Sequence, residues 1–389
     1  MREDFLLLNP GPVPITRSVR RAMDAPMVSH RSAEFESVYE RAQDGLDYVF
    51  RRSTPDESVT NEDGTSLVLN GTATMGMEAA VANLADTDSE VVSLVNGKFG
   101  RRFARIADRY ARTTRVEVEW GDSFDMDTVA AALDDDTDIV TMVHNETSTG
   151  LLNPIEAVGE LTDEHDAHFV VDGVTSIGGD EFRIDDWHVD MAITDAQKAL
   201  AAPPGVSAMY VTDRAAMAID GDRAPFYEDL DWYLRKADDH QTPFTSAVPL
   251  FRALAVAVEQ IREEGMAARI DRHRRQAAAF RDGFARMGLD GFPIVDGPTD
   301  PSNTVTAVSL PAAVQENPAA FFDAVADRGV SISGGQAHLG GQIFRVSNMG
   351  NLTTRQVVRG VRTIGEAMAT VGIDVDIQAG IDAAREVLH

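Results

Sequence analysis

Between about residue 66 and residue 211 the chain alternates short apolar segments with segments of helical pattern, and this alternation restricts the possible folds more than any other feature. Strands that alternate with helices are typical of βαβ units, whose strands run parallel in one sheet. We therefore predict an α/β fold with a mostly parallel sheet of seven strands. The predicted strands are Ser66–Leu69, Glu90–Val95, Thr114–Val118, Ile139–His144, Phe169–Val171, Met191–Thr194 and Val206–Val211.

The rest of the chain predicts an N-terminal arm and a second, smaller domain. The prolines of Asn9–Pro14 favour an extended, rigid segment there rather than a strand of a sheet, and we predict an N-terminal arm over residues 1–18. The pattern over Pro249–Glu264 predicts a long amphipathic helix that carries the chain out of a large domain, residues 19–255. Residues 256–389 are predicted to form a small α+β domain. Its predicted strands are Val305–Leu310, Val330–Ser333 and Gln342–Val346.

The net charge of the chain argues against nucleic acid as a partner and indicates a saline environment. The 389 residues include 63 acidic and 35 basic ones, a formal charge of −28. Duplex nucleic acid is therefore not an expected partner, because binding to it depends on basic groups that neutralise phosphates. With 43% hydrophobic residues the chain is globular and carries its acid on the surface. Such surfaces are typical of very saline cytoplasm, where salt screens the repulsion, so we expect a halophilic source.

Cysteine and long apolar segments are both missing from the sequence. The absence of cysteine excludes disulfides, thiolate metal sites and a catalytic thiol. The apolar residues of Phe5–Leu8 are too few for a signal peptide, and no later run approaches the roughly 18 residues of a membrane span. We therefore predict a cytoplasmic protein that does not enter a membrane.

Lysine is rare, and one lysine has an unusual setting. It occurs only at Lys98, Lys198 and Lys236, so arginine supplies nearly all of the positive charge. Lys198 follows a predicted strand and lies among small residues, and Pro203-Pro204-Gly205 prevents a long helix after it. Burial of an ammonium group lowers its pKa and makes the neutral amine a nucleophile for an aldehyde, a reaction that arginine cannot perform. The sequence therefore indicates amine chemistry at Lys198, with a solvated loop lysine as the alternative.

Four polar segments follow predicted strands at the edge of the sheet where ligands bind in such folds. Asn70–Gly76 precedes a helix and offers hydroxyls and backbone N–H groups to a phosphate, although helix caps also have this pattern. Asn96–Gly100 presents Phe99 for stacking on a planar ring, with a core position as the alternative. Asn145–Gly150 is a polar loop that is able to bind a ligand or simply to cap a turn.

The fourth segment places Asp172 at the end of an apolar strand. A carboxylate there is costly unless it meets a cation. A protonated pyridine nitrogen, an arginine or a metal ion would serve, but no cluster of His, Asp and Glu with metal-ligand spacing supports the metal.

Together these segments resemble the class V aminotransferases of the pyridoxal-phosphate-dependent fold type I superfamily, and within them the alanine–glyoxylate and serine–pyruvate aminotransferase branch. The resemblance covers nearly the whole chain, and the order and spacing of the motifs make it specific. The matching segments are Pro10–Pro12, Gly71–Thr74, Met77–Ala79, Asn96–Gly100, His144–Gly150, Val171–Ser176, Gln197–Gly205, Gln241–Thr245 and Phe344–Val346.

The resemblance implies a role for each residue of a pyridoxal 5′-phosphate site. Lys198 would form the Schiff base and move the proton, and Asp172 would pair with the pyridine nitrogen. Thr147 would lie beside the phenolic oxygen and Phe99 would stack on the ring, where some relatives have tryptophan. The implied phosphate contacts are Thr72, Ala73 (glycine in many members), Thr74 and Gln197.

The resemblance also implies a homodimer with shared active sites. Thr242 and Thr245 would reach the phosphate in the neighbouring subunit. Arg345 would bind the substrate α-carboxylate, and we expect water or a small anion beside it in the empty protein. His30 and Arg31 belong to a polar loop to which we assign no role.

The function that follows is transfer of an amino group from alanine or serine to glyoxylate or pyruvate by a ping-pong mechanism. An aspartate or phosphoserine donor is the alternative, and its distal anion would need a second cation such as His30, Arg31 or His338. A lyase or aldolase on the same fold is disfavoured, and a desulfurase is excluded because its mechanism needs a thiolate. A non-catalytic scaffold does not fit a chain that keeps Lys198, Asp172 and Arg345.

Overall fold

The centre of the molecule is a seven-stranded sheet, described by a computed structural model that covers residues 5–292 and 297–389. The strand order is β2-β10-β9-β8-β5-β3-β4, and only β10 runs antiparallel to its neighbours. The strands are β2 (Thr65–Leu69), β3 (Glu90–Val95), β4 (Arg112–Glu117), β5 (Thr137–Val143), β8 (His168–Asp172), β9 (Met191–Asp195) and β10 (Ser207–Val211). All seven predicted strands are present, which confirms the mostly parallel sheet.

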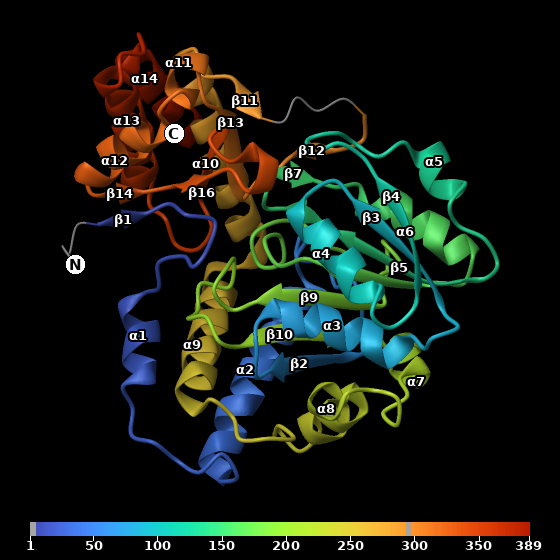
Figure 1. Cartoon of the computed structure of the whole chain (residues 1–389). Coiled ribbons are helices and arrows are strands. Elements are labelled where there is room, and N and C mark those ends of the chain that lie inside the picture. The colour runs from blue at the N-terminus through green and yellow to red at the C-terminus, as the bar shows by residue number, and fades with distance from the viewer. Residues whose placement is uncertain (1–4, 293–296) are drawn as a thin grey trace.

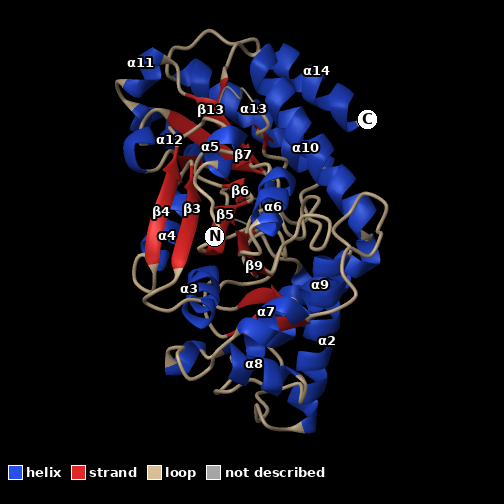
Figure 2. Ribbon diagram, turned by 90° about the vertical axis from the view of Figure 1, so that its right-hand side faces the viewer, coloured by secondary structure: helices blue, strands red, loops and turns tan. Residues whose placement is uncertain are grey.

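Helices cover the sheet, and the strands lie in the interior (Figure 2). In the view of Figure 1, α3 and α4 cross in front of the strands. All five residues of β9 are buried, as expected for an apolar strand with helices on both faces. The helices of this part are α1 (Arg17–Met23), α2 (Ala33–Arg51), α3 (Ala73–Leu84), α4 (Lys98–Ala107), α5 (Met126–Ala130), α6 (Ile155–Glu164), α7 (Asp213–Ala218), α8 (Leu230–Ala237) and the 3₁₀ helix η1 (Phe226–Glu228).

The C-terminal part has its own sheet and its own apolar core. Its four strands are antiparallel in the order β11-β13-β16-β15, with bounds β11 (Gly291–Phe292), β13 (Val305–Ser309), β15 (Ser333–Gly334) and β16 (Ile343–Ser347). The helices of this part are α10 (Met266–Arg286), α11 (Ala312–Gln315), α12 (Pro318–Asp327), η2 (Ala337–Leu339), α13 (Thr354–Thr370) and α14 (Ile377–Leu388). The predicted helix at Pro249–Glu264 is confirmed as α9 (Val248–Glu264). The domain boundary at residue 255 stays a prediction.

The N-terminal arm differs from the prediction in one respect. Residues Asn9–Pro14 contain no strand, as predicted, but Leu6–Leu7 forms β1, which pairs in parallel with β14 (Val330–Ser331). The predicted strand Val330–Ser333 is consequently split between β14 and β15. The reason is apolar burial, because Leu6 and Leu8 are 2% and 0% exposed and belong to the small core.

A short three-stranded sheet and one arginine connect the two parts. The sheet has the order β12-β7-β6, with β6 (Asn145–Glu146), β7 (Leu151–Leu152) and β12 (Asp300–Pro301). Arg269 of α10 is 1% exposed and donates to the carbonyl oxygens of Gly178 and Ala199, both at 2.6 Å. Ala199 directly follows Lys198, so this buried guanidinium holds the lysine loop against α10. Among the described helices, none combines the length and the apolar character needed to cross a bilayer.

Candidate active site

Three of the predicted site residues gather where β5, β8 and β9 end, at the carboxyl edge of the sheet. Asp172 is the last residue of β8, and Lys198 follows β9 after a tight turn. Arg345 of β16 reaches the same place, because it bonds to the loop after β5. The charges of Asp172 and Arg345 both act on the pKa of Lys198. The structure therefore brings together three residues that are far apart in the sequence.

Lys198 is a buried amine. Lys198 is only 9% exposed, and this burial lowers the pKa of its amine to about 8. Arg345 and Arg102 lower this pKa further, whereas Asp195 and Asp172 oppose the shift. Near neutral pH the neutral amine is consequently far more abundant than it is for a solvated lysine.

The Pro-Gly-Pro arm lies directly on this lysine. Lys198 Nζ donates to the carbonyl oxygen of Pro10. Gly11 has a φ of +116°, and a Cβ atom there would lie 2.6 Å from Lys198 Cε. Only glycine permits this close approach, so the extended arm forms one wall of the site.

Asp172 is a carboxyl group in a position that favours its neutral form. It is 4% exposed, and burial raises its pKa to about 7, with the charge of Glu146 acting in the same direction. One oxygen accepts a hydrogen bond from Val174 N at 2.9 Å, and the charges of Lys198 and Arg102 lower the pKa only in part. A cationic ligand group beside Asp172 would favour its ionised form.

Glu146 is a central residue that sequence reasoning missed. It is fully buried, and burial raises its pKa. Its Oε2 accepts from Phe99 N at 3.0 Å and Gly100 N at 3.1 Å, at the N-terminus of α4. Its Oε1 accepts from Ser148 N at 3.0 Å. This one carboxylate therefore fixes the predicted stacking residue and the loop of Thr147 relative to each other.

Thr147 and Phe99 each contact a second residue of the site. The Thr147 hydroxyl shares a hydrogen bond with the Thr175 hydroxyl at 3.1 Å. The guanidinium carbon of Arg102 lies 4.9 Å from the centre of the Phe99 ring. Arg102 also donates to Thr74 Oγ1 at 2.8 Å. Arg102, which the sequence analysis did not single out, thus links the stacking position to the predicted phosphate contacts.

Arg345 is held by backbone carbonyl groups. It is 3% exposed, its Nη1 donates to Thr147 O at 2.6 Å, and its Nε and Nη2 donate to Gly334 O at 3.1 and 2.8 Å. Burial lowers its pKa to about 10. Neutral carbonyls therefore orient the guanidinium without neutralising its charge, and water or a small anion beside it stays a prediction.

The predicted phosphate contacts surround the first turn of α3. Thr72 is the N-cap residue, but its side chain makes no capping hydrogen bond. Ala73 N donates instead to Asp195 Oδ2 at 3.0 Å, and Gln197 N donates to Asp195 Oδ1 at 3.3 Å. Asp195, a second residue that sequence reasoning missed, thus lies between Ala73 and Gln197.

Thr242 and Thr245 belong to the segment between α8 and α9. Thr242 is fully buried, and its hydroxyl donates to Phe244 O at 2.7 Å, whereas Thr245 is exposed. No hydrogen bond among the described residues joins either threonine to Lys198 or to the first turn of α3. Arg31 donates to Thr242 O at 2.7 Å and Pro243 O at 3.0 Å. It therefore shapes this segment, and its assignment as a cation for a distal anion has no support within one chain.

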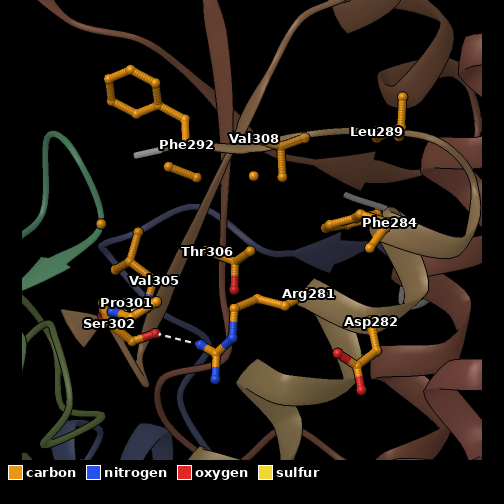
Figure 3. Close-up of a pocket in the computed structure, with 14 residues that line it drawn as sticks. Arg281, Asp282, Phe284, Leu289, Phe292, Pro301, Ser302, Val305, Thr306 and Val308 are labelled. Carbon is orange, nitrogen blue, oxygen red and sulfur yellow. Dashed lines mark hydrogen bonds between the residues drawn. The ribbon is translucent and has the colours of Figure 1, made fainter. Parts of the chain in front are cut away.

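The cavity in Figure 3 is lined mostly by the C-terminal part, and Gly150 of the loop after β5 also lines it. Its volume is about 260 Å³, and Arg281, Phe284 and Val308 are among its lining residues. None of the predicted site residues lines it. We therefore define the active site by its reactive side chains and not by the shape of this cavity.

Comparison with known proteins agrees with the geometry. The family model described as aminotransferase class-V matches residues 19–359. The chain belongs to the class V aminotransferases. An uncharacterized aminotransferase of Methanocaldococcus jannaschii is 36% identical over 98% of this chain and 97% of its own. The L-aspartate–glyoxylate aminotransferase of Paracoccus denitrificans is 30% identical over 97% and 94%.

A solved structure shows the same fold as this aminotransferase. The alanine–glyoxylate aminotransferase of a Nostoc species superposes with a TM-score of 0.85 and 30% identity, covering 94% of this chain and 95% of the other. The fold is therefore that of the pyridoxal-phosphate-dependent aminotransferases, and the chain is a transaminase of this type. Its cofactor is pyridoxal 5′-phosphate, which when bound accepts electrons from the substrate Cα.

The buried Asp172 predicts a pH-dependent change in stability. Its folded pKa, about 7, lies above the ordinary 3.8, so only the folded protein keeps the proton between these values. The stabilisation is complete at low pH and is lost as the pH rises through about 7. In cofactor-free protein, Asp172→Asn should therefore raise the melting temperature relative to the parent, and by clearly more at pH 8 than at pH 5.

Melting curves of the two proteins at both pH values measure this directly. The cofactor-loaded enzyme is the control, and there Asp172→Asn should lower the melting temperature, because the carboxylate then meets the protonated ring nitrogen. A difference between variant and parent that is the same at pH 5 and pH 8 would contradict the assignment.

Proposed function

We propose that this aminotransferase moves an amino group from a small amino acid, alanine or serine, to glyoxylate or pyruvate by a ping-pong mechanism. One observation carries the proposal: a buried amine, Lys198, and a buried carboxyl group, Asp172, lie at the same edge of the sheet. The aminotransferases from Paracoccus denitrificans and Nostoc described above share glyoxylate in their names and differ in the donor. Their names therefore support the acceptor more than the donor.

The residues fit pyridoxal phosphate in three respects. Lys198 offers a neutral amine to the aldehyde and then moves the proton at the substrate Cα. Asp172, ionised by a cationic partner, holds the ring nitrogen protonated. The first turn of α3 offers backbone N–H groups to the phosphate. We assign the remaining contacts to Thr72, Ala73, Thr74 and Gln197 at the phosphate, Phe99 on the ring face and Thr147 at the phenolic oxygen.

Arg345 has the geometry to bind a carboxylate with two hydrogen bonds. A guanidinium has five N–H groups, and the described carbonyl contacts use Nε–H and one N–H on each terminal nitrogen. One N–H on each terminal nitrogen is therefore left for a ligand. Two N–H donors suit the two oxygens of a substrate α-carboxylate, and we assign Arg345 to that role.

A dicarboxylic or phosphorylated donor is the second candidate, and one observation favours it. A groove of about 620 Å³ that includes Thr74 is lined by two acidic residues, Glu78 and Asp108, and by five basic ones. The basic residues are Lys98, Arg101, Arg102, Arg105 and Arg109. In a chain with a formal charge of −28, such a concentration of positive charge attracts an anion to this side of the site.

A panel of donors tests the proposal. Alanine and serine should give pyruvate-type products with glyoxylate as acceptor, whereas aspartate and phosphoserine should be much poorer donors. The assay measures product amino acid for each donor with glyoxylate, pyruvate and 2-oxoglutarate, in low and in molar salt. Lys198→Ala should lower turnover by about 10²–10⁴-fold or more, because the nucleophile and the proton carrier are lost together.

The matched control is Lys236→Ala, which removes a half-buried lysine that pairs with Asp239. It should leave turnover unchanged. Release of an aldehyde without amino transfer would indicate an aldolase, and equal turnover in parent and Lys198→Ala would end the proposal.

We also propose a homodimer in which Thr242 and Thr245 complete the phosphate site of the neighbouring subunit. Phe226 and Tyr227 support a partner surface, since they are 74% and 46% exposed, and Tyr227 stacks on Phe244 with ring centres 4.7 Å apart. These aromatic side chains lie beside the segment of Thr242 and Thr245. Large exposed aromatic side chains are common at subunit interfaces.

Hybrid dimers test this arrangement. When Lys198→Ala subunits are mixed with Thr242→Ala/Thr245→Ala subunits, each hybrid carries both defects in one site and none in the other. Activity after exchange should therefore exceed that of either parent, whereas sites built within one chain would gain nothing. Subunit exchange is followed by native mass spectrometry, and free exchange without recovered activity would refute the shared site.

A further inference from the structure

A carboxylate already occupies the place where an anion would bind at α3. Asp195 is 3% exposed and ends β9, three residues before Lys198. Its Oδ2 accepts from Ala73 N at 3.0 Å, and its Oδ1 accepts from Gln197 N at 3.3 Å. Ala73 is the first residue of α3, and the Thr72 side chain contributes no cap. A side chain from β9 thus satisfies the first N–H of this helix.

This arrangement sets up a competition between two anions. The N-terminal N–H groups of a helix stabilise negative charge, and the effect falls off within the first turn. A phosphate placed there needs the Ala73 N–H, which Asp195 holds, and it would lie beside a carboxylate of the same sign. Burial raises the pKa of Asp195, whereas the hydrogen bonds from Ala73 N and Gln197 N and the charge of Lys198 favour its ionised form. Repulsion between the two anions in a buried setting is stronger than it would be in water.

We propose that Asp195 is a specificity residue of this site: its carboxylate competes with phosphate for Ala73 N–H and so weakens the binding of phosphorylated pyridine ligands, but not of the corresponding free alcohols. The inference rests on the proposed function, because it takes the phosphate to lie at the first turn of α3. The consequence is a cofactor site that holds its phosphate loosely and discriminates weakly between phosphate ester and alcohol.

Two substitutions separate charge from shape. Asp195→Asn keeps the size of the side chain and removes its charge, and its amide N–H₂ can donate to a phosphate. Asp195→Ser shortens the side chain and frees Ala73 N. The control is Asp190→Asn, which removes a buried carboxylate that accepts from Phe169 N at 2.8 Å before β9 begins, at the opposite edge of the sheet.

The probes are pyridoxamine 5′-phosphate and pyridoxamine, titrated calorimetrically into the full-length, cofactor-free protein. Neither probe carries an aldehyde, so neither reacts with Lys198 and both report non-covalent contacts alone. Both Asp195 variants should bind the phosphate ester at least tenfold more tightly than the parent, with pyridoxamine affinity changed less than twofold. Asp190→Asn should leave both affinities unchanged, and melting temperatures confirm that each protein is folded.

Unchanged or weaker binding of the phosphate ester in both folded Asp195 variants would overturn the inference, because Asp195 would then support the phosphate site. A gain that appears equally for pyridoxamine would overturn it as well, since the effect would not belong to the phosphate. If neither probe binds any of the proteins, the cofactor site itself is misplaced and the proposed function falls. If the parent binds both probes and turns over alanine while the variants gain nothing, only the inference on Asp195 falls.

Discussion

The burial of charge at one edge of the sheet is the constraint on which the rest of the structure depends. Lys198, Asp172 and Glu146 are each less than 10% exposed, and burial shifts the pKa of each toward the neutral form. Leaving charges buried without partners is costly, so the surrounding residues must position them accurately. The same burial makes Lys198 nucleophilic near pH 8 and makes Asp172 responsive to a cationic ligand.

Several supports from distant segments maintain this arrangement. Glu146 ties the N-terminus of α4 to the loop of Thr147, and the carbonyl of Thr147 orients Arg345. The close approach of Glu146 requires Gly97, where a Cβ atom would lie 2.2 Å from Glu146 Cγ. Arg269 holds the Lys198 loop from α10. Most of these contacts are hydrogen bonds between a side chain and the backbone. Removing the side chain would leave a buried backbone group without its partner, which is costly.

The sequence predicted the elements that depend on apolar periodicity and on motif order. Six strands of the large sheet and α9 were predictable, because buried strands are continuous apolar runs and α9 has a regular apolar face. The seventh strand, β4, was also predicted, although it is mostly exposed. The pairing of β1 with β14 was not, since two-residue strands carry no periodicity. Lys198, Asp172 and Arg345 were predicted as site residues, and the structure places all three at one edge of the large sheet.

The residues that were missed share a physical reason. They contact backbone N–H groups or another side chain: Glu146 contacts Gly100 N, Asp195 contacts Ala73 N and Arg102 contacts Thr74. Such contacts join segments that are distant in the sequence, so no local sequence pattern predicts them. A signal was present for Glu146 and Asp195, because each is an acid next to an apolar strand. Arg31 is similar, since its contacts with Gln241, Thr242 and Pro243 span more than 200 residues.

The central claim is that Lys198 is the amine that carries the cofactor, and the scarcity of lysine makes it directly measurable. The chain has three lysines, Lys98, Lys198 and Lys236. Reduction of the cofactor-loaded enzyme with borohydride, followed by digestion and mass spectrometry, locates the pyridoxyl group on one peptide. The account predicts stoichiometric labelling of Lys198 alone, and loss of the label in Lys198→Ala. Labelling of Lys98 or Lys236, or equal labelling of Lys198→Ala and parent, would contradict it.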